Sequence, residues 1–476
     1  MGKNKNKNGS PALIVLIAVI IVGAVSMAPL KKWSSGMLKD FNLVSDIMHD
    51  SLLVEEEEED TVSLPDIDPA LLLAMKSDTV KPTRKLVMGP DSVFVEEEEE
   101  DEVVLPEPIM VERTESGVLP IEDYSPTGNG LAHLRAAISS GRLARIAVTG
   151  DSYIEGDIFC QDVREKLQTA YGGSGVGYVN MYSEFPGFRR SVRQSGKGWK
   201  IHMASKSGTN SKYVGLWENY FTTEGSAWSE YKGCTTIAHL DSWTVSRFLF
   251  IAPNDCKIKA SANGVETEYD ITGADYVQEI KVVAPGTNDF KLSVSSSSII
   301  GLGVWLDSES GIGVDCMSSR GFSGVTLANI STAVSQESRN MVDYDLIILE
   351  FGINALTAKQ KDYSVYSGHM VKVIRHLRSC YPNADFLVMG IGDRGQKKGG
   401  GVKSMSTVPN MIDAQRTAAR TAGCLFWDTR AAMGGEDAIV EWSKTGRANK
   451  DYIHLTHKGG ADLAGEFVNA LQQMLR

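Results

Sequence analysis

Three polar side chains that lie far apart in the sequence have the types needed for an activated nucleophile. Ser152 supplies a hydroxyl, and His454 follows Asp451 by three residues. A serine hydroxyl is a poor nucleophile unless an imidazole removes its proton, and the imidazole needs a carboxylate that fixes its tautomer. Because Asp451 can reach the ring of His454 from the same turn of loop, the three residues are predicted to be the nucleophile, base and orienting acid of an acyl transfer.

Two local alternatives bear on this assignment. Ser152 stands between an apolar run and a helical pattern, and such a serine is by itself typical of a helix N-cap. His457, three residues after His454, competes for the role of base. Since His457 lacks the carboxylate that Asp451 offers to His454, His454 is the predicted base.

The candidate residues follow segments with the pattern of buried strands. The largely apolar run 145–149 ends at Gly150-Asp151-Ser152, and the run 346–350 precedes Asn354. Helical periodicity recurs at 131–139, 366–380, 411–422 and 459–475. Strands that alternate with helices imply a parallel sheet covered on both faces, and reactive groups collect at the carboxyl ends of its strands. The sequence therefore predicts an α/β domain with its site at that edge.

Four blocks of the sequence resemble the GDSL/SGNH hydrolase family and occur in the family's order. They are Gly150-Asp151-Ser152, Gly324 within the stretch 320–324, Asn354, and Asp451-x-x-His454. The resemblance covers roughly residues 121–476 apart from an internal β-rich segment. It implies a flavodoxin-like parallel sheet with helices on both faces, and ester hydrolysis by a Ser-His-Asp mechanism.

The resemblance also implies an oxyanion hole, built from the backbone N–H groups of Ser152 and Gly324 and the side-chain amide of Asn354. Donors aimed at the developing negative charge are typically worth about 3 kcal/mol each. The chain departs from the family at Ala355, where an acidic residue is common, although the amide donor is present. No cofactor is expected. The six cysteines lie far apart without a CxxC pair, so no metal site is expected either.

Residues 188–306 interrupt the α/β pattern with short runs rich in Val, Ile, Thr, Phe and Trp, separated by turn residues. This pattern predicts an inserted β-sandwich, so that the hydrolase domain consists of residues 121–187 and 307–476. The arrangement is similar to exported bacterial peptidoglycan O-acetylesterases, in which a carbohydrate-binding-like β-domain interrupts the hydrolase. Four tryptophans of the insert fit either a sugar-binding face or a core. They are Trp199, Trp217, Trp228 and Trp243.

The N-terminus contains a segment that is long enough to cross a bilayer. Residues 12–30 carry no charge, and a transmembrane helix needs about 20 apolar residues. Three lysines precede this segment, so the positive-inside rule places residues 1–10 in the cytoplasm and the span 11–30 in the inner membrane. The catalytic part is then extracytoplasmic, in the bacterial periplasm or at the cell surface. Cleavage of a signal peptide near Ala24-Val25-Ser26 is the alternative.

Two acidic runs, at 55–60 and 96–102, account for the formal net charge of −12 and leave the rest of the chain near neutral. Like charges repel and do not pack, so residues 31–120 are predicted to form a disordered stalk, with docking to a basic partner as the alternative. A near-neutral remainder lacks the basic surface that nucleic acid requires. In an oxidising compartment Cys234 and Cys256 either pair or stay as core thiols.

Together these features predict a serine esterase that removes acyl groups, O-acetyl above all, from a cell-wall or surface glycan. An outward-facing site on a flexible stalk suits a polymeric substrate near the membrane. One alternative is an O-acyltransferase that places acetyl groups on glycan, supplied by a membrane acyltransferase partner. Another is a glycan-binding protein whose hydrolase site is idle.

Overall fold

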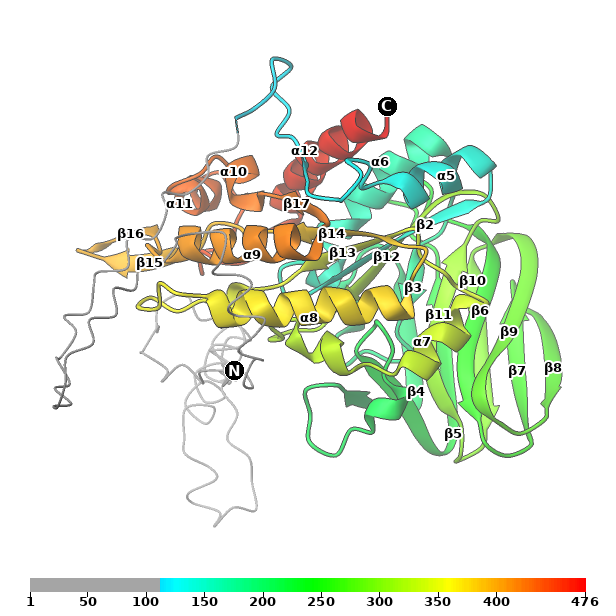
Figure 1. Cartoon of the computed structure of the whole chain (residues 1–476). Helices are drawn as coiled ribbons and strands as arrows, with labels where there is room; N and C mark the ends of the chain where they lie inside the picture. The colour runs from blue at the N-terminus through cyan, green and yellow to red at the C-terminus, as the bar shows by residue number, and fades with distance from the viewer. Residues whose placement is uncertain (1–111) are drawn as a thin grey trace, which may run out of the picture. The chain divides into compact units, whose positions relative to one another are not determined.

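A mainly parallel sheet lies at the centre of the computed structural model, which describes residues 112–476 (Figure 1). Its six strands have the order β1-β17-β14-β13-β2-β12; five are parallel, and β1 is antiparallel at one edge. The strands are β1 (Glu122–Asp123), β2 (Leu143–Gly150), β12 (Gly311–Ser318), β13 (Leu346–Glu350), β14 (Asp385–Met389) and β17 (Leu425–Trp427). The predicted parallel sheet is confirmed.

Helices cover both faces of this sheet because apolar side chains alternate between the faces along each strand. In β13, Ile347 and Leu349 pack with α7, α8 and α9, whereas Leu346 and Ile348 pack with the other helices. The first group is α7 (Thr332–Arg339), α8 (Ser364–Cys380) and α9 (Val408–Ala422). The second is α5 (Ala132–Ser140), α6 (Cys160–Tyr171), α10 (Thr429–Met433), α11 (Ala438–Lys444) and α12 (His457–Leu475).

The insert is one connected sheet of nine antiparallel strands, seen beside the central sheet in Figure 1. It comprises β3 (Gly177–Val179), β4 (Arg193–Met203), β5 (Asn219–Lys232), β6 (Trp243–Ala252), β7 (Cys256–Ala262), β8 (Val265–Ile271), β9 (Ala274–Thr287), β10 (Asp289–Ser295) and β11 (Ile300–Asp307). Its core cluster contains no helical residue. The sheet therefore curls over its own core, where the sequence predicted a sandwich.

The insert begins earlier than the predicted limit of 188, because β3 pairs with β11 and starts at Gly177. A three-residue strand is too short to show a period, which is why the sequence pattern misses it. Trp199 and Trp243 lie in the insert's core and Trp217 lies in the core beneath it. The ring of Trp228 is half-buried, and the ammonium group of Lys291 lies over it, 5.2 Å from the ring centroid.

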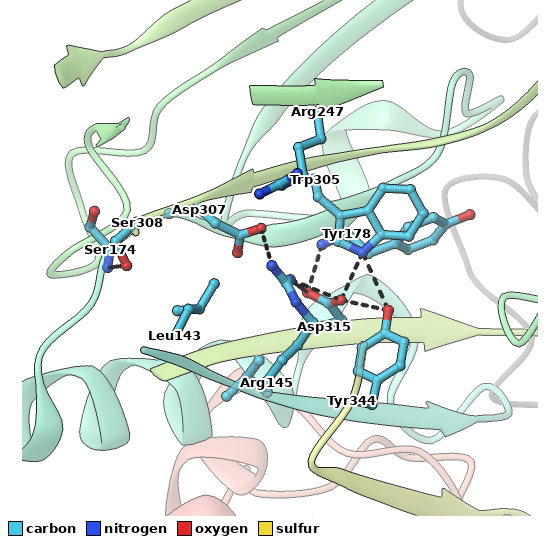
Figure 2. Close-up of polar contacts among 12 residues, drawn as sticks. Leu143, Arg145, Ser174, Tyr178, Arg247, Trp305, Asp307, Ser308, Asp315 and Tyr344 are labelled. Carbon is cyan, nitrogen blue, oxygen red and sulfur yellow. Dashed lines mark hydrogen bonds and ion pairs between the residues drawn. The ribbon is translucent and has the colours of Figure 1, made fainter. Parts of the chain in front are cut away.

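A buried polar network ties β11 of the insert to β2 and β12 of the central sheet (Figure 2). Nη2 of Arg145 donates to Asp307 Oδ2 at 2.8 Å, and Nη1 lies 3.3 Å from Asp315. Oδ2 of Asp315 also accepts from Trp305 Nε1 and from Tyr344 Oη, each at 2.8 Å. Buried charges persist only when they are paired and hydrogen-bonded, so this network fixes how the two sheets meet.

The last residues of the predicted stalk belong to the folded part. Leu119 is buried and its carbonyl accepts from Trp427 Nε1 at 3.3 Å, while Arg113 pairs with Glu466 at 2.6 Å. The folded part therefore starts before residue 121. Within 112–476 no helix combines the length and the apolar character needed to cross a bilayer. The predicted span 11–30 and stalk residues 31–111 lie outside the described residues.

Candidate active site

A tight turn after β2 presents Ser152. Gly150 is required there, because a Cβ atom at that position would lie 2.6 Å from the carbonyl oxygen of Glu350 in the neighbouring strand. The Asp151 N–H donates to the same carbonyl, and the buried Asp151 carboxylate accepts from the Tyr153 N–H at 2.9 Å. The backbone around Ser152 is therefore held on both sides.

The structure brings Ser152, His454 and Asp451 together although 302 residues separate the first two. Oγ of Ser152 lies 2.9 Å from His454 Nε2, and Nδ1 of that ring lies 2.8 Å from Asp451 Oδ2. Ser152 does not cap the helix after it, since α6 begins at Cys160 with Phe159 in the cap position. The hydroxyl instead faces an imidazole whose other nitrogen is held by a carboxylate.

The loop before α12 orients the acid and the base. Oδ1 of Asp451 accepts the backbone N–H groups of Ile453 and His454, and Tyr452 between them adopts a left-handed conformation with φ of 58°. Burial raises the pKa of Asp451, but the hydrogen bond from the His454 ring and those from the two N–H groups outweigh it and leave that pKa below its ordinary value. Asp451 is thus ionised near neutral pH and can stabilise an imidazolium.

His457, the competing base, lies elsewhere. It is the first residue of α12, and its Nδ1 faces Gln161 Nε2 at 3.4 Å. Burial, and then the charge of Arg190, lowers the pKa of His457. Neither of these neighbours is a serine hydroxyl, so the geometry favours His454 as the base.

Gly324 and Asn354 frame the space beside Ser152. Gly324 has a left-handed backbone with φ of 85°, and a Cβ atom on it would lie 2.7 Å from the ring of Phe351. Nδ2 of Asn354 donates to Asp151 Oδ2 at 3.0 Å and to the carbonyl of Phe322 at 2.9 Å. Asn354 thereby links the Ser152 turn to the loop that carries Gly324. Both of its amide protons are used in these bonds, so its service as an oxyanion donor stays a prediction.

A second carboxyl group, which the sequence reasoning missed, lies beside Asp151. Glu350 is buried, and its Oε2 has no hydrogen-bond partner among the described residues. Burial, and then the nearby Asp151, raises the pKa of Glu350 well above its ordinary value. Burial likewise raises the pKa of Asp151 to about 7. An acidic residue at the end of the apolar run 346–350 was the available signal.

Glu350→Gln is expected to flatten the pH dependence of stability. A carboxyl whose pKa rises on folding binds more protons in the folded than in the unfolded state, so stability falls as pH rises above its ordinary value. For Glu350 this loss begins at its ordinary pKa of 4.5. Urea unfolding at about pH 5 and about pH 8 should show a smaller loss in the variant than in the wild type. Equal losses in the two proteins would contradict a protonated Glu350.

Glu218 of the insert anchors the loop around Gly324. Its carboxylate accepts hydrogen bonds from Thr326 and Ser319, which flank Gly324 on either side. Burial raises the pKa of Glu218 to about 7, which the two hydrogen bonds lower in part. The insert therefore takes part in shaping the candidate site. No sequence signal marked Glu218, because its partners lie about a hundred residues away.

One buried group has donors close enough for a metal ion. The donor atoms of Asp157, Cys160 and Cys316 lie within 4.8 Å of one another. Arg164, however, donates to both Asp157 oxygens, at 2.7 and 3.1 Å. A guanidinium in that position opposes a second cation, and Asp157 is better described as part of a buried ion pair. All six cysteines are free thiols, Cys234 and Cys256 among them.

Comparison with solved structures identifies the fold of the chain. No family model and no curated protein matches the sequence. Among solved structures, a peptidoglycan O-acetylesterase matches at a TM-score of 0.60 and 21% identity, over 75% of this chain and 99% of its own. The chain has the fold of that esterase. The match agrees at the level of fold with the resemblance to SGNH hydrolases, and fold alone does not determine a reaction.

Two further structures match at low TM-scores. A family two carbohydrate esterase from Cellvibrio japonicus matches at 0.25 with 9% identity, over 60% of this chain and 98% of its own. A salicylyl-acyltransferase from a tetracycline biosynthetic pathway matches at 0.27 with 9% identity and the same coverage.

Proposed function

We propose that the chain is a serine esterase of the SGNH type that removes O-acetyl groups from a cell-wall or surface glycan. The observation that carries the proposal is the pair of hydrogen bonds that join Ser152 to His454 and His454 to Asp451, at 2.9 and 2.8 Å. A hydroxyl, an imidazole and an ionised carboxylate in this order form an activated nucleophile on unrelated folds. The shared fold with a peptidoglycan O-acetylesterase structure supports a glycan ester as substrate.

The chemistry follows from this geometry. Ser152 Oγ attacks the ester carbonyl while His454 Nε2 takes its proton, and Asp451 stabilises the imidazolium. The N–H groups of Ser152 and Gly324 are the proposed donors to the oxyanion. His454 then protonates the leaving sugar oxygen, and a water molecule, deprotonated by the same imidazole, releases acetate from Ser152.

The solvent exposure of the candidate site suits a polymeric substrate. The side chains of His454 and Asp451 are 39% and 40% exposed, so a glycan chain can approach without opening the fold. We further propose that residues 11–30 anchor the chain and leave this site outside the inner membrane. The stalk would then let the enzyme reach esters along a fixed polymer.

Gly324→Ala is expected to lower kcat by about 10²-fold to 10³-fold, with a smaller change in KM, because the added Cβ meets Phe351 and displaces an oxyanion donor. The matched control is Gly321→Ala, which has a similar positive φ of 78° but open space around its Cβ. It should lose less than about tenfold. Steady-state kinetics on p-nitrophenyl acetate measure both. Equal losses in the two variants would remove Gly324 from the oxyanion hole.

The proposed function is tested with the purified full-length chain on O-acetylated peptidoglycan and acetylated xylan. Acetate release is measured against the same polymers after alkaline de-O-acetylation. We expect release from at least one acetylated polymer and none from the stripped ones. No release from any acetylated glycan would contradict the proposal, and an increase in glycan mass in the presence of an acyl donor would assign transfer instead.

A further inference from the structure

A cavity of about 510 Å³ opens in the insert, between the segment that leads from β3 into β4 and the residues that follow β5. Its walls come from the stretch 186–194, without Phe188 and Ser191, and from residues 233–236. Its charged residues are Arg189, Arg190 and Arg193, and no carboxylate lines it. A volume of this size accommodates a sugar unit with its substituents. None of these residues belongs to the triad or to the oxyanion hole.

The cavity adjoins the chain that follows the nucleophile. The ring of Phe188 lies against Gly156, since a Cβ atom there would come within 2.8 Å of it. Nη2 of Arg189 lies 3.4 Å from Asp157 Oδ2. Gly156 is four residues after Ser152, which places their Cα atoms within about 14 Å of each other. Arg189, which lines the cavity, therefore links it to the stretch of chain that directly follows the nucleophile.

The positive charge of the cavity is not neutralised by the protein. Arg190 and Arg193 are exposed and form no ion pair within residues 112–476. Arg189 shares Asp157 with Arg164, which already holds that carboxylate at 2.7 Å. Arginine binds carboxylate and phosphate through parallel N–H bonds, so a cluster of this kind suits an oxyanion.

The surroundings also suit a sugar. Phe185 and Phe188, in the segment that borders the cavity, are 75% and 44% exposed, and exposed aromatic rings of this kind can stack on sugar faces. Thr235 and Thr236, two residues with hydroxyl groups, also line the cavity. Aromatic rings, hydroxyls and unpaired guanidinium groups together match a sugar unit that carries an acidic group.

We propose that this arginine-lined cavity is a subsite for a carboxylate or phosphate group on the glycan whose ester Ser152 cleaves. The inference rests on the proposed esterase function and makes the enzyme selective for acidic polymers. The acidic group binds Arg190 and Arg193, and the acetyl ester lies further along the same chain, at Ser152. Binding of this group lowers KM for the polymer, because it lies away from the reacting carbonyl.

The test is the double variant Arg190→Gln/Arg193→Gln. For each enzyme, kcat/KM on an acidic O-acetylated glycan is divided by kcat/KM on p-nitrophenyl acetate, which has no acidic group to bind. We expect this ratio to fall at least tenfold in the variant, through KM. The matched control is Lys197→Gln/Lys200→Gln, which removes two exposed positive charges from β4 outside the cavity and should leave the ratio within about twofold.

Two chemically treated polymers identify which acidic group of the glycan the arginines recognise. In one the carboxylates are converted to amides, and in the other the phosphates are removed. The difference between wild type and arginine variant should vanish on the polymer that has lost the recognised group. An unchanged ratio in the arginine variant overturns the subsite and leaves the esterase standing. A wild type that hydrolyses neither substrate overturns the proposed function itself.

Discussion

Ser152→Ala is expected to lower kcat for acetyl-ester hydrolysis by on the order of 10⁶-fold, to the level left by binding and the oxyanion donors alone. The reason is that Ser152 Oγ is the nucleophilic atom that His454 Nε2 faces at 2.9 Å. No other hydroxyl is hydrogen-bonded to that nitrogen in the described chain. The measurement is kcat on p-nitrophenyl acetate and acetate release from acetylated glycan.

The fold should survive this change. The substitution removes one side-chain hydrogen bond, worth about 1 kcal/mol, and the turn around it is held by backbone and by Asp151. The control is Ser310→Ala, at an exposed serine in the turn between β11 and β12, which should keep full activity. A Ser152→Ala protein that is folded and keeps more than about 1% of the activity would remove Ser152 from the mechanism.

His454→Ala is expected to lower kcat by a similar factor, because Ser152 then has no group to accept its proton. Asp451 cannot substitute for the ring, since it contacts the far nitrogen, Nδ1. The loss should therefore persist across the pH range in which the fold is stable. Kinetics on p-nitrophenyl acetate from about pH 5 to about pH 9 measure it.

The matched control is His457→Ala, three residues further along. His457 faces Gln161 and not the nucleophile, so this variant should lose less than about tenfold. The two variants thus distinguish the catalytic base from a structural residue at the start of α12. Comparable losses in both variants, or a larger loss at His457, would contradict the assignment.

Some of this architecture could be predicted because it is local in the sequence. The apolar runs that became β2 and β13 are continuous and end in turn residues, so their ends marked Ser152 and Asn354. The spacing of Asp451 and His454 is a property of one short loop and did not need the rest of the fold. That these segments would meet followed from the rule that parallel strands present their carboxyl ends at one edge.

Other features of the fold and the site depend on contacts between distant segments, and no periodicity in the sequence marks them. Glu218 acts on the loop of Gly324 through Thr326 and Ser319, which no pattern connects to it. In the sequence, Glu350 is only the polar residue at the end of an apolar run. In the structure it is buried beside Asp151. The curled sheet of the insert likewise reflects how its strands close over a shared core, whereas alternation along each strand shows only that one face is buried.

The most direct test of the activated nucleophile is covalent labelling with a fluorophosphonate, followed by mass spectrometry of the digested full-length chain. Such a reagent reacts with a serine whose proton is taken by a neighbouring imidazole. We predict one adduct, on the peptide that contains Ser152, and its loss in His454→Ala. An adduct on a different residue, or an unlabelled Ser152 in a preparation that hydrolyses acetyl esters, would contradict the account.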